Sequence, residues 1–234
     1  MSAPGGLSPV CILAGGVGSR LGDAVIQTPK PLLEVAGEPF LHHQLRLLAE
    51  HGATRVVLCV GYLGETIERR VGAERFGIEI AYSYDGPDLL GTAGALRRAL
   101  PLLGDVFLVL YGDTYLRVDY LAVEQAFRAS GAPALMTVLR NRGRWDVSNA
   151  VLRGGRVVRY DKAHPAPEME WIDYGLGVLT PAALDAAPDA PDLADVYRAL
   201  ARSGELAGFE ARERFYEIGT PGALAETEAF LRHP

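Results

Sequence analysis

The sequence predicts a single α/β domain of three layers, with helices on both faces of a mainly parallel sheet. Two observations lead to this prediction. Short apolar runs alternate with amphipathic helical patterns through the first 130 residues, and such alternation is typical of right-handed βαβ crossovers. At 234 residues, with 49% hydrophobic and 22% charged side chains, the chain has the composition of a globular protein with one large core.

The first part of the chain, about residues 9–130, carries the regular alternation. Its apolar runs PVCILA, RVVLCVGY, IEIAYSY and VFLVLYGD predict strands at residues 9–14, 55–62, 78–84 and 106–113. The segments between them show apolar residues at helical spacing, which predicts helices at residues 39–52, 64–72, 91–100 and 121–130.

From about residue 133 to the end, short strand candidates are separated by polar turns, so we expect a mixed sheet in the second half, residues 131–234. The predicted strands lie at residues 134–140, 149–162, 171–179, 206–211 and 214–219. Amphipathic helices are expected at residues 193–204 and 221–232. The stretch PAALDAAPDAPD, residues 181–192, reads as a loose loop.

Charge and hydropathy exclude several classes of partner. The net charge of −6 argues against a nucleic-acid backbone as the main ligand. No apolar run approaches the roughly 20 residues of a membrane span, and MSAPGGLSPV lacks the basic and apolar parts of a signal peptide. We therefore expect a cytoplasmic protein with no membrane partner. Cys11 and Cys59 each lie in an apolar run, which predicts two buried thiols rather than a disulfide or metal pair.

The lysines are unusual because 21 of the 23 basic residues are arginine. Lys30 lies between Pro29 and Pro31, and Lys162 follows the strand candidate VVRYD. A chain that uses arginine almost everywhere has little reason to place lysine on an ordinary solvated face. Lysine carries a compact charge on a flexible stem, whereas the guanidinium of arginine is planar and delocalised.

A glycine-rich segment, ILAGGVGSRLG, follows the first predicted strand and places four glycines between residues 15 and 22. Glycine permits a positive φ and lets backbone N–H groups approach a phosphate or a base. The segment is neither a dinucleotide fingerprint, because the third glycine of GxGxxG is missing, nor a Walker loop. By itself it is a weak signal of nucleotide binding.

The order of several blocks is more specific. The segments LAGGVGSRLG, TPKPLLEVAGEPFL, LLGTAGAL, LYGDT, YDK, IDYGLGVL and YEIGTP follow one another between residues 9 and 231. Together they resemble the sugar-1-phosphate nucleotidyltransferases, most closely the mannose-1-phosphate and heptose-1-phosphate guanylyltransferase branches. The resemblance implies a Rossmann-like, GT-A-like nucleotidyltransferase fold. It also implies transfer of a nucleotide from a nucleoside triphosphate, with GTP favoured, to a sugar-1-phosphate, with Mg²⁺ as cofactor.

The resemblance assigns the nucleotide to the first half of the chain. It implies catalytic roles for Arg20, Lys30 and Asp113, with Arg20 and Lys30 on the triphosphate and Asp113 on magnesium. The helix that begins near Gly91 is expected to offer free N–H groups to the nucleotide. The further nucleotide-binding residues that the resemblance implies are Leu13, Ala14, Gly15, Gly16, Gly18, Ser19, Gly91, Thr92, Ala93 and Gly112.

In the second half, Lys162 matches the family lysine that holds the phosphate of the sugar-1-phosphate, and Asp161 matches a residue that binds a sugar hydroxyl. Asp173 and Gly175 match an Asn-x-Gly that contacts the sugar. Asn149 stands where relatives carry glycine, and asparagine is the next best residue at positive φ. Glu217 stands where relatives place a second metal-binding aspartate, so its role as a ligand is less secure than that of Asp113.

Three alternatives stay open at the level of sequence. A nucleotide-sugar-dependent glycosyltransferase shares the architecture, although it ordinarily carries an Asp-x-Asp motif where this chain has GDTYL. A non-catalytic nucleotide-sugar sensor is disfavoured by the presence of Arg20, Lys30 and Asp113. A UTP- or dTTP-using transferase differs only in the base. The sequence also leaves open whether the chain forms a homo-oligomer.

Overall fold

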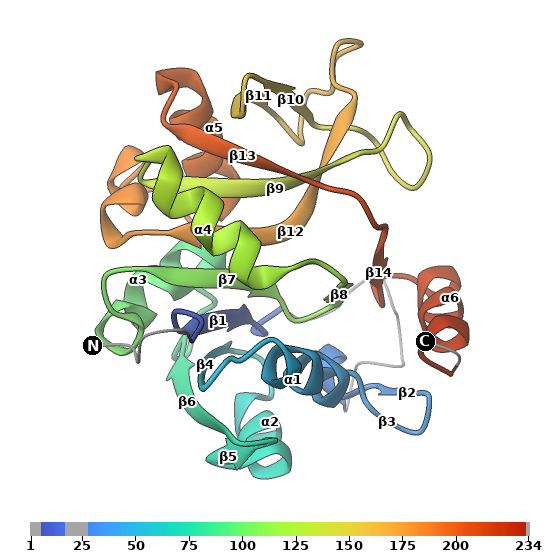
Figure 1. Cartoon of the computed structure of the whole chain (residues 1–234). Coiled ribbons are helices and arrows are strands. Elements are labelled where there is room, and N and C mark those ends of the chain that lie inside the picture. Colours follow the sequence, from blue (N-terminus) through green and yellow to red (C-terminus); the bar gives the residue numbers. More distant parts are fainter. Residues whose placement is uncertain (1–5, 17–27, 233–234) are drawn as a thin grey trace.

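The structure is a computed structural model that describes residues 6–16 and 28–232. Its main feature is one sheet of ten strands in the order β10-β11-β13-β9-β12-β7-β1-β4-β6-β5, which runs through the molecule from top to bottom in Figure 1. The strands at one end of this sheet are mostly parallel, whereas those at the other end are mixed. The first group comes from the first half of the chain and the second group from the second half. No helix within the described ranges is long and apolar enough to cross a membrane.

The strands of the first half are parallel. β7 (Phe107–Tyr111), β1 (Val10–Leu13), β4 (Arg55–Val60) and β6 (Ile78–Tyr84) lie side by side in this order, and β5 (Glu74–Arg75) adds a short antiparallel edge. Their apolar runs are buried because helices cover both faces of the sheet. Because these four strands are parallel, their carboxyl ends all lie on the same side of the sheet.

The strands of the second half are mixed. β12 (Trp171–Leu179) pairs antiparallel with both β7 and β9 (Ala134–Arg140), and so joins the two halves. β13 (Leu206–Ala211) runs parallel to β9. At the edge, β10 (Ala150–Arg153) and β11 (Arg156–Tyr160) form a hairpin. The mixed sheet predicted for the second half is confirmed.

Helices cover the two faces of the sheet with separate cores. One core joins the strands to α1 (Phe40–Glu50), α2 (Gly64–Val71) and α4 (Tyr120–Ser130). The other joins them to α3 (Gly91–Leu103) and α5 (Leu193–Ser203). The expected three-layer α/β/α architecture is confirmed. The predicted loop at residues 181–192 differs in part, because its first half forms a 3-10 helix, η3 (Pro181–Ala186).

A small group of elements lies to one side of the large sheet, at the right in Figure 1, and includes the C-terminal helix. It contains η2 (Lys30–Leu32) and the ribbon of β2 (Glu34–Val35) and β3 (Glu38–Pro39). It also contains the pair β8 (Thr114–Leu116) and β14 (Phe215–Glu217), and α6 (Pro221–Arg232). Val35, Phe40 and Ile218 form its buried core. This packing brings Glu217 next to the strand that follows Asp113.

Candidate active site

A cavity of about 330 Å³ opens at the carboxyl ends of the four parallel strands, where ligands of open α/β sheets bind. Each strand supplies lining residues at or near its end: β1 supplies Leu13 to Gly16, β4 supplies Cys59, β6 supplies Asp85, and β7 supplies Tyr111 to Asp113. We call this space the first cavity. Its other lining residues are Lys30, Pro31, Leu89, Gly91, Thr92, Ala95 and Asp192.

Two glycines let the strand ends approach one another at this cavity. A Cβ atom on Gly15 would lie 3.1 Å from the Gly61 nitrogen, and one on Gly112 would lie 3.0 Å from the Leu13 carbonyl oxygen. Neither Gly15 nor Gly16 has a positive φ, so these two glycines do not use the left-handed backbone that glycine permits. What Gly15 and Gly112 provide is close contact between backbones.

Lys30 begins the 3-10 helix η2, in which the Leu33 N–H donates to the Lys30 carbonyl oxygen at 3.1 Å. Pro29 and Pro31 restrict φ on either side of the lysine. The Lys30 ammonium donates to Asp113 Oδ2 at 2.6 Å, with only 11% of the lysine side chain and 27% of the aspartate side chain exposed. The structure thus brings together Lys30 and Asp113, two of the three predicted catalytic residues. The third, Arg20, lies outside the described residues.

Asp85 is a buried carboxylate in the wall of the first cavity, with 6% of the residue exposed. It follows β6 directly, and its Oδ2 atom accepts a long hydrogen bond of 3.4 Å from the Leu90 N–H. Burial raises the pKa of Asp85, an effect opposed by the Leu90 N–H and the Arg98 guanidinium. A buried carboxylate with unused acceptor capacity is suited to binding a hydrogen-bond donor of a ligand.

The first turn of α3 forms another wall, and it docks against the segment before α5. The Pro191 carbonyl oxygen accepts from the Ala93 N–H at 2.8 Å and from the Gly94 N–H at 3.3 Å. Gly91 has a φ of 74°, and a Cβ atom there would lie 2.5 Å from the same oxygen. The expectation that this helix start offers its N–H groups to the nucleotide is therefore wrong for Ala93 and Gly94.

A second cavity of about 600 Å³ lies against the first, and the two share Tyr111 and Asp113. Turns and strand ends of the mixed half supply most of its wall, together with Thr114 of β8 and Glu217 of β14. Its other lining residues are Asp146, Val147, Asn149, Lys162, Ala163, Pro165, Ile172, Asp173, Tyr174, Gly175 and Phe215.

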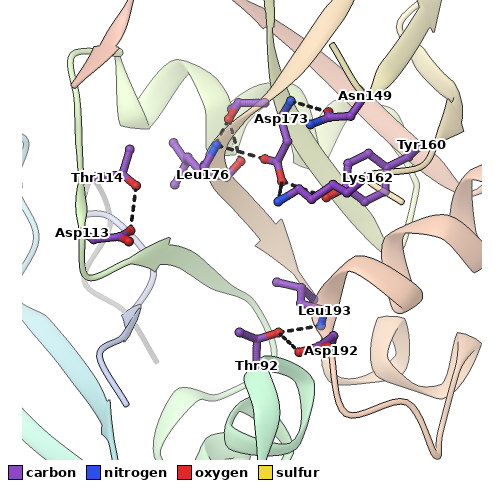
Figure 2. Close-up of polar contacts among 12 residues, drawn as sticks. Thr92, Asp113, Thr114, Asn149, Tyr160, Lys162, Asp173, Leu176, Asp192 and Leu193 are labelled. Atoms are coloured by element: carbon purple, nitrogen blue, oxygen red, sulfur yellow. Dashed lines mark hydrogen bonds and ion pairs between the residues drawn. The ribbon is translucent and has the colours of Figure 1, made fainter. Parts of the chain in front are cut away.

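Lys162 is held in the second cavity by Asp173, as Figure 2 shows. The distance from Lys162 Nζ to Asp173 Oδ2 is 3.0 Å, with 45% of the lysine side chain but only 4% of the aspartate side chain exposed. Asp173 also accepts from the Tyr160 hydroxyl and from the Gly175 N–H, each at 3.0 Å. The carboxylate is thus engaged by three protein donors. Its geometry fits positioning of Lys162 more than direct contact with a sugar.

The backbone of Asn149 and the position of Asp161 differ from what the resemblance implies. Asn149 does not have a positive φ, so the expectation drawn from the glycine of its relatives is wrong. Its buried side chain instead accepts from the Asp173 N–H at 2.9 Å and so fixes that strand. The Asp161 carboxylate accepts from the N–H groups of Ala163 and His164, at 2.9 and 3.0 Å, and Asp161 does not line either cavity.

The two carboxylates predicted to bind metal both line the second cavity near its junction with the first. β14 pairs with β8 so that Glu217 lies opposite Thr114, and the Ile218 N–H donates to the Asp113 carbonyl oxygen at 3.0 Å. The described residues hold no cluster of three or more carboxylate, histidine or cysteine ligands. Mg²⁺ commonly uses one or two carboxylates and takes its other ligands from water and substrate phosphates. Asp113 and Glu217 fit that pattern.

The structure brings most of the predicted residues into these walls. Ala93 is buried behind the first cavity, Asp161 faces its own turn, and Gly18 and Ser19 lie outside the described residues. Sequence reasoning missed Asp85, Tyr111 and Asp192, although Asp85 directly follows a predicted strand and Tyr111 lies within the block LYGDT, signals that were available.

Known proteins resemble this chain over most of its length. A family model described as nucleotidyl transferase matches residues 10–146. The N-acetylmuramate alpha-1-phosphate uridylyltransferase of Neisseria meningitidis is 33% identical over 93% of this chain and 96% of its own length. The mannose-1-phosphate guanyltransferase beta-B of Xenopus laevis is 28% identical over 90% of this chain, which spans only 61% of that protein.

Solved structures share the fold. The inositol-1-phosphate CTP transferase from T. maritima superposes with a TM-score of 0.79 at 20% identity, covering 98% of each chain. HddC from Yersinia pseudotuberculosis superposes with a TM-score of 0.78 at 22% identity, covering 96% of this chain and 100% of its own. With the family model matched over more than half of its length, the chain belongs to the nucleotidyl transferase family.

Proposed function

We propose that this protein transfers a nucleotide from a nucleoside triphosphate to a sugar-1-phosphate, giving a nucleoside diphosphate sugar and pyrophosphate. One observation carries the proposal. Two cavities meet at Asp113, and each holds one of the only two lysines in the chain, Lys30 in the first and Lys162 in the second. Paired anion sites on either side of a shared carboxylate suit a reaction between two phosphates.

In this reaction a phosphate oxygen of the sugar-1-phosphate attacks the α-phosphorus of the triphosphate. The bond from the α-phosphorus to the bridging oxygen breaks, and pyrophosphate leaves with that electron pair. Lys30 is placed to contact the triphosphate and Lys162 the acceptor phosphate. Each lysine is paired with a carboxylate, Asp113 or Asp173, which holds the ammonium groups in position before phosphates bind.

Asp113 and Glu217 are the residues that would hold Mg²⁺ at the junction of the cavities. The ion, when bound, supplies positive charge to the phosphate oxygens. The Lys30 ammonium, 2.6 Å from Asp113 Oδ2, adds a fixed charge on the triphosphate side. Because that ammonium is mostly shielded from solvent, its interaction with phosphate is screened less than an exposed pair would be.

We infer GTP as the preferred donor from the buried carboxylate of Asp85. The Watson–Crick edge of guanine presents two adjacent donors, N1–H and N2–H₂, and a carboxylate can accept both at once. Uracil and thymine present one N3–H between two carbonyl oxygens, which a carboxylate repels. Proteins similar to this chain include uridylyl-, cytidylyl- and guanylyltransferases, and a UTP- or dTTP-using enzyme is the alternative to a GTP-using one.

Pyrophosphate release from five nucleoside triphosphates, each with a panel of sugar-1-phosphates, tests the proposal. We expect release only when both substrates and Mg²⁺ are present, and fastest release with GTP. Release that continues fully in excess chelator, or without any sugar-1-phosphate, contradicts the proposed reaction. A clear preference for UTP or dTTP contradicts the inferred base and leaves the reaction class standing.

A further inference from the structure

Asp192 stands at the N-cap position of α5 but does not cap this helix with its own side chain. The Leu193 N–H instead donates to Thr92 Oγ1 on α3 at 2.7 Å. The neighbouring Pro191 carbonyl oxygen is bound by the first turn of α3, as described above. Three hydrogen bonds between the backbone of residues 191–193 and α3 therefore fix the chain at Asp192, and the Asp192 carboxylate makes no capping hydrogen bond to its own helix.

The carboxylate of Asp192 lines the first cavity and not the second. Within residues 6–16 and 28–232, its hydrogen-bond partner is the Thr92 hydroxyl, at a long 3.4 Å, and it forms no ion pair. Figure 2 shows Thr92, Asp192 and Leu193 together, away from Asp113. An ionised carboxylate has about four acceptor positions, so most of them stay open to a ligand in the cavity.

The chemistry of a nucleotide limits which of its groups can use these acceptors. The phosphates are anionic, and a carboxylate repels them. Lys30 and Asp113 mark the phosphate end of the first cavity in the proposed function, and Asp85 marks the base. The remaining part of the nucleotide is the ribose, whose vicinal hydroxyls are neutral donors. In dinucleotide-binding folds a carboxylate accepts a hydrogen bond from the ribose 2′-hydroxyl.

We propose that Asp192 accepts hydrogen bonds from the 2′- and 3′-hydroxyls of the bound nucleoside triphosphate, so that the protein selects ribonucleotides over 2′-deoxyribonucleotides. This inference rests on the proposed function in taking the first cavity as the nucleotide site. Thr92 contributes by holding Leu193 and by contacting one side of the carboxylate. Asp192 is thereby a specificity-determining residue that the recognised sequence blocks do not include.

The test measures binding by isothermal titration calorimetry with Mg²⁺ and without a sugar-1-phosphate, so that it does not depend on turnover. The probes are GTP against 2′-deoxy-GTP and UTP against 2′-deoxy-UTP. For whichever base the wild type binds more tightly, we expect the ribonucleotide to bind about tenfold or more tightly than its 2′-deoxy form. This is the size of effect expected for a hydrogen bond to a charged group. Asp192→Asn and Asp192→Ala should bring the ratio of the two affinities close to one, mainly by weakening the binding of the ribonucleotide.

A matched control removes the same charge from the same segment. Asp189→Asn changes an exposed aspartate that lines neither cavity, and it should leave the ratio as in the wild type. A general disturbance of the segment would weaken both members of a pair equally and leave the ratio unchanged. An unchanged ratio in both Asp192 variants, or a wild type that binds both sugars equally, overturns the inference.

The two proposals fail in different ways. If the wild type prefers ribonucleotides through Asp192 but no sugar-1-phosphate supports pyrophosphate release, the ribose contact is supported and the proposed transfer reaction is contradicted. If transfer occurs and Asp192→Asn keeps the wild-type preference, the reaction stands and the ribose contact falls.

Discussion

The two cavities are built in different ways. The first lies where four parallel strands end, and its lysine has 11% of the side chain exposed. The second is formed mainly by turns and by strands that run in both directions, and its lysine has 45% of the side chain exposed. Parallel strands bring all their carboxyl ends to one edge, so the first site is a product of the fold itself. The second depends on individual turns.

This difference has an energetic consequence. An ion pair shielded from water is screened less and costs more to break than an exposed one. Lys30 is expected to matter more than Lys162, and changes in the second cavity should be tolerated better. The following variants test that ranking.

Lys30→Ala should have the largest effect. Removing a preorganised positive charge from the first cavity is expected to lower kcat/KM by about 10³-fold, the upper part of the range for such donors. The fall in kcat/KM should be larger for the nucleoside triphosphate than for the sugar-1-phosphate. Steady-state kinetics with each substrate varied in turn measures it, and Lys30→Arg serves as the charge-conserving control. Near-wild-type activity of Lys30→Ala would show that the Lys30–Asp113 pair is structural only.

Lys162→Ala should cost less, about 10²-fold in kcat/KM. If Lys162 anchors the acceptor, its loss should raise the KM for the sugar-1-phosphate more than that for the nucleotide. The same kinetic experiment gives both values. An identical KM profile in the two lysine variants would remove the distinction between the cavities.

Glu217→Gln tests the junction of the cavities. It keeps the side-chain volume and removes the charge, so turnover at limiting Mg²⁺ is expected to fall by about tenfold or more and to recover in part as Mg²⁺ is raised. Glu213→Gln is the control, because Glu213 is an exposed residue of the same segment that lines neither cavity. Wild-type Mg²⁺ dependence in Glu217→Gln would leave Asp113 as the single protein ligand.

Asp85→Asn should have the smallest effect of these variants. It should also raise the stability of the folded protein. Burial raises the pKa of Asp85, so the ionised carboxylate destabilises the folded state, and this penalty vanishes as pH falls through that pKa. The variant should therefore have a higher Tm than the wild type at pH 7, and the difference should narrow on acidification. Differential scanning calorimetry measures both. Asp88→Asn, a change at an exposed aspartate in the same loop, is the control variant.

The same variant should bind GTP more weakly, because an asparagine oxygen accepts only one of the two guanine donors and its NH₂ group opposes the other. Calorimetric titration with GTP measures the loss, which we expect to be about tenfold. A GTP affinity equal to that of the wild type would place the base elsewhere in the first cavity.

Much of the fold was predictable because the apolar runs alternate with helical patterns in the first half. Lys30, Asp113 and Lys162 were predictable from the recognised blocks and from the rarity of lysine. Asp192 was not, since it belongs to a stretch that reads as a loop and reaches the cavity only because Pro191 docks on α3. The same contact occupies the Ala93 and Gly94 N–H groups, and no local pattern shows it. Tertiary contacts of this kind lie beyond sequence periodicity.

The division of labour between the cavities is the central claim, and crossed binding measurements test it most directly. Lys30→Ala and Lys162→Ala are each titrated calorimetrically with GTP and, separately, with the sugar-1-phosphate that supports turnover. We expect a crossed pattern, in which Lys30→Ala loses affinity for GTP alone and Lys162→Ala loses affinity for the sugar-1-phosphate alone. Equal losses of both ligands in both variants, or losses in the reverse order, would contradict it.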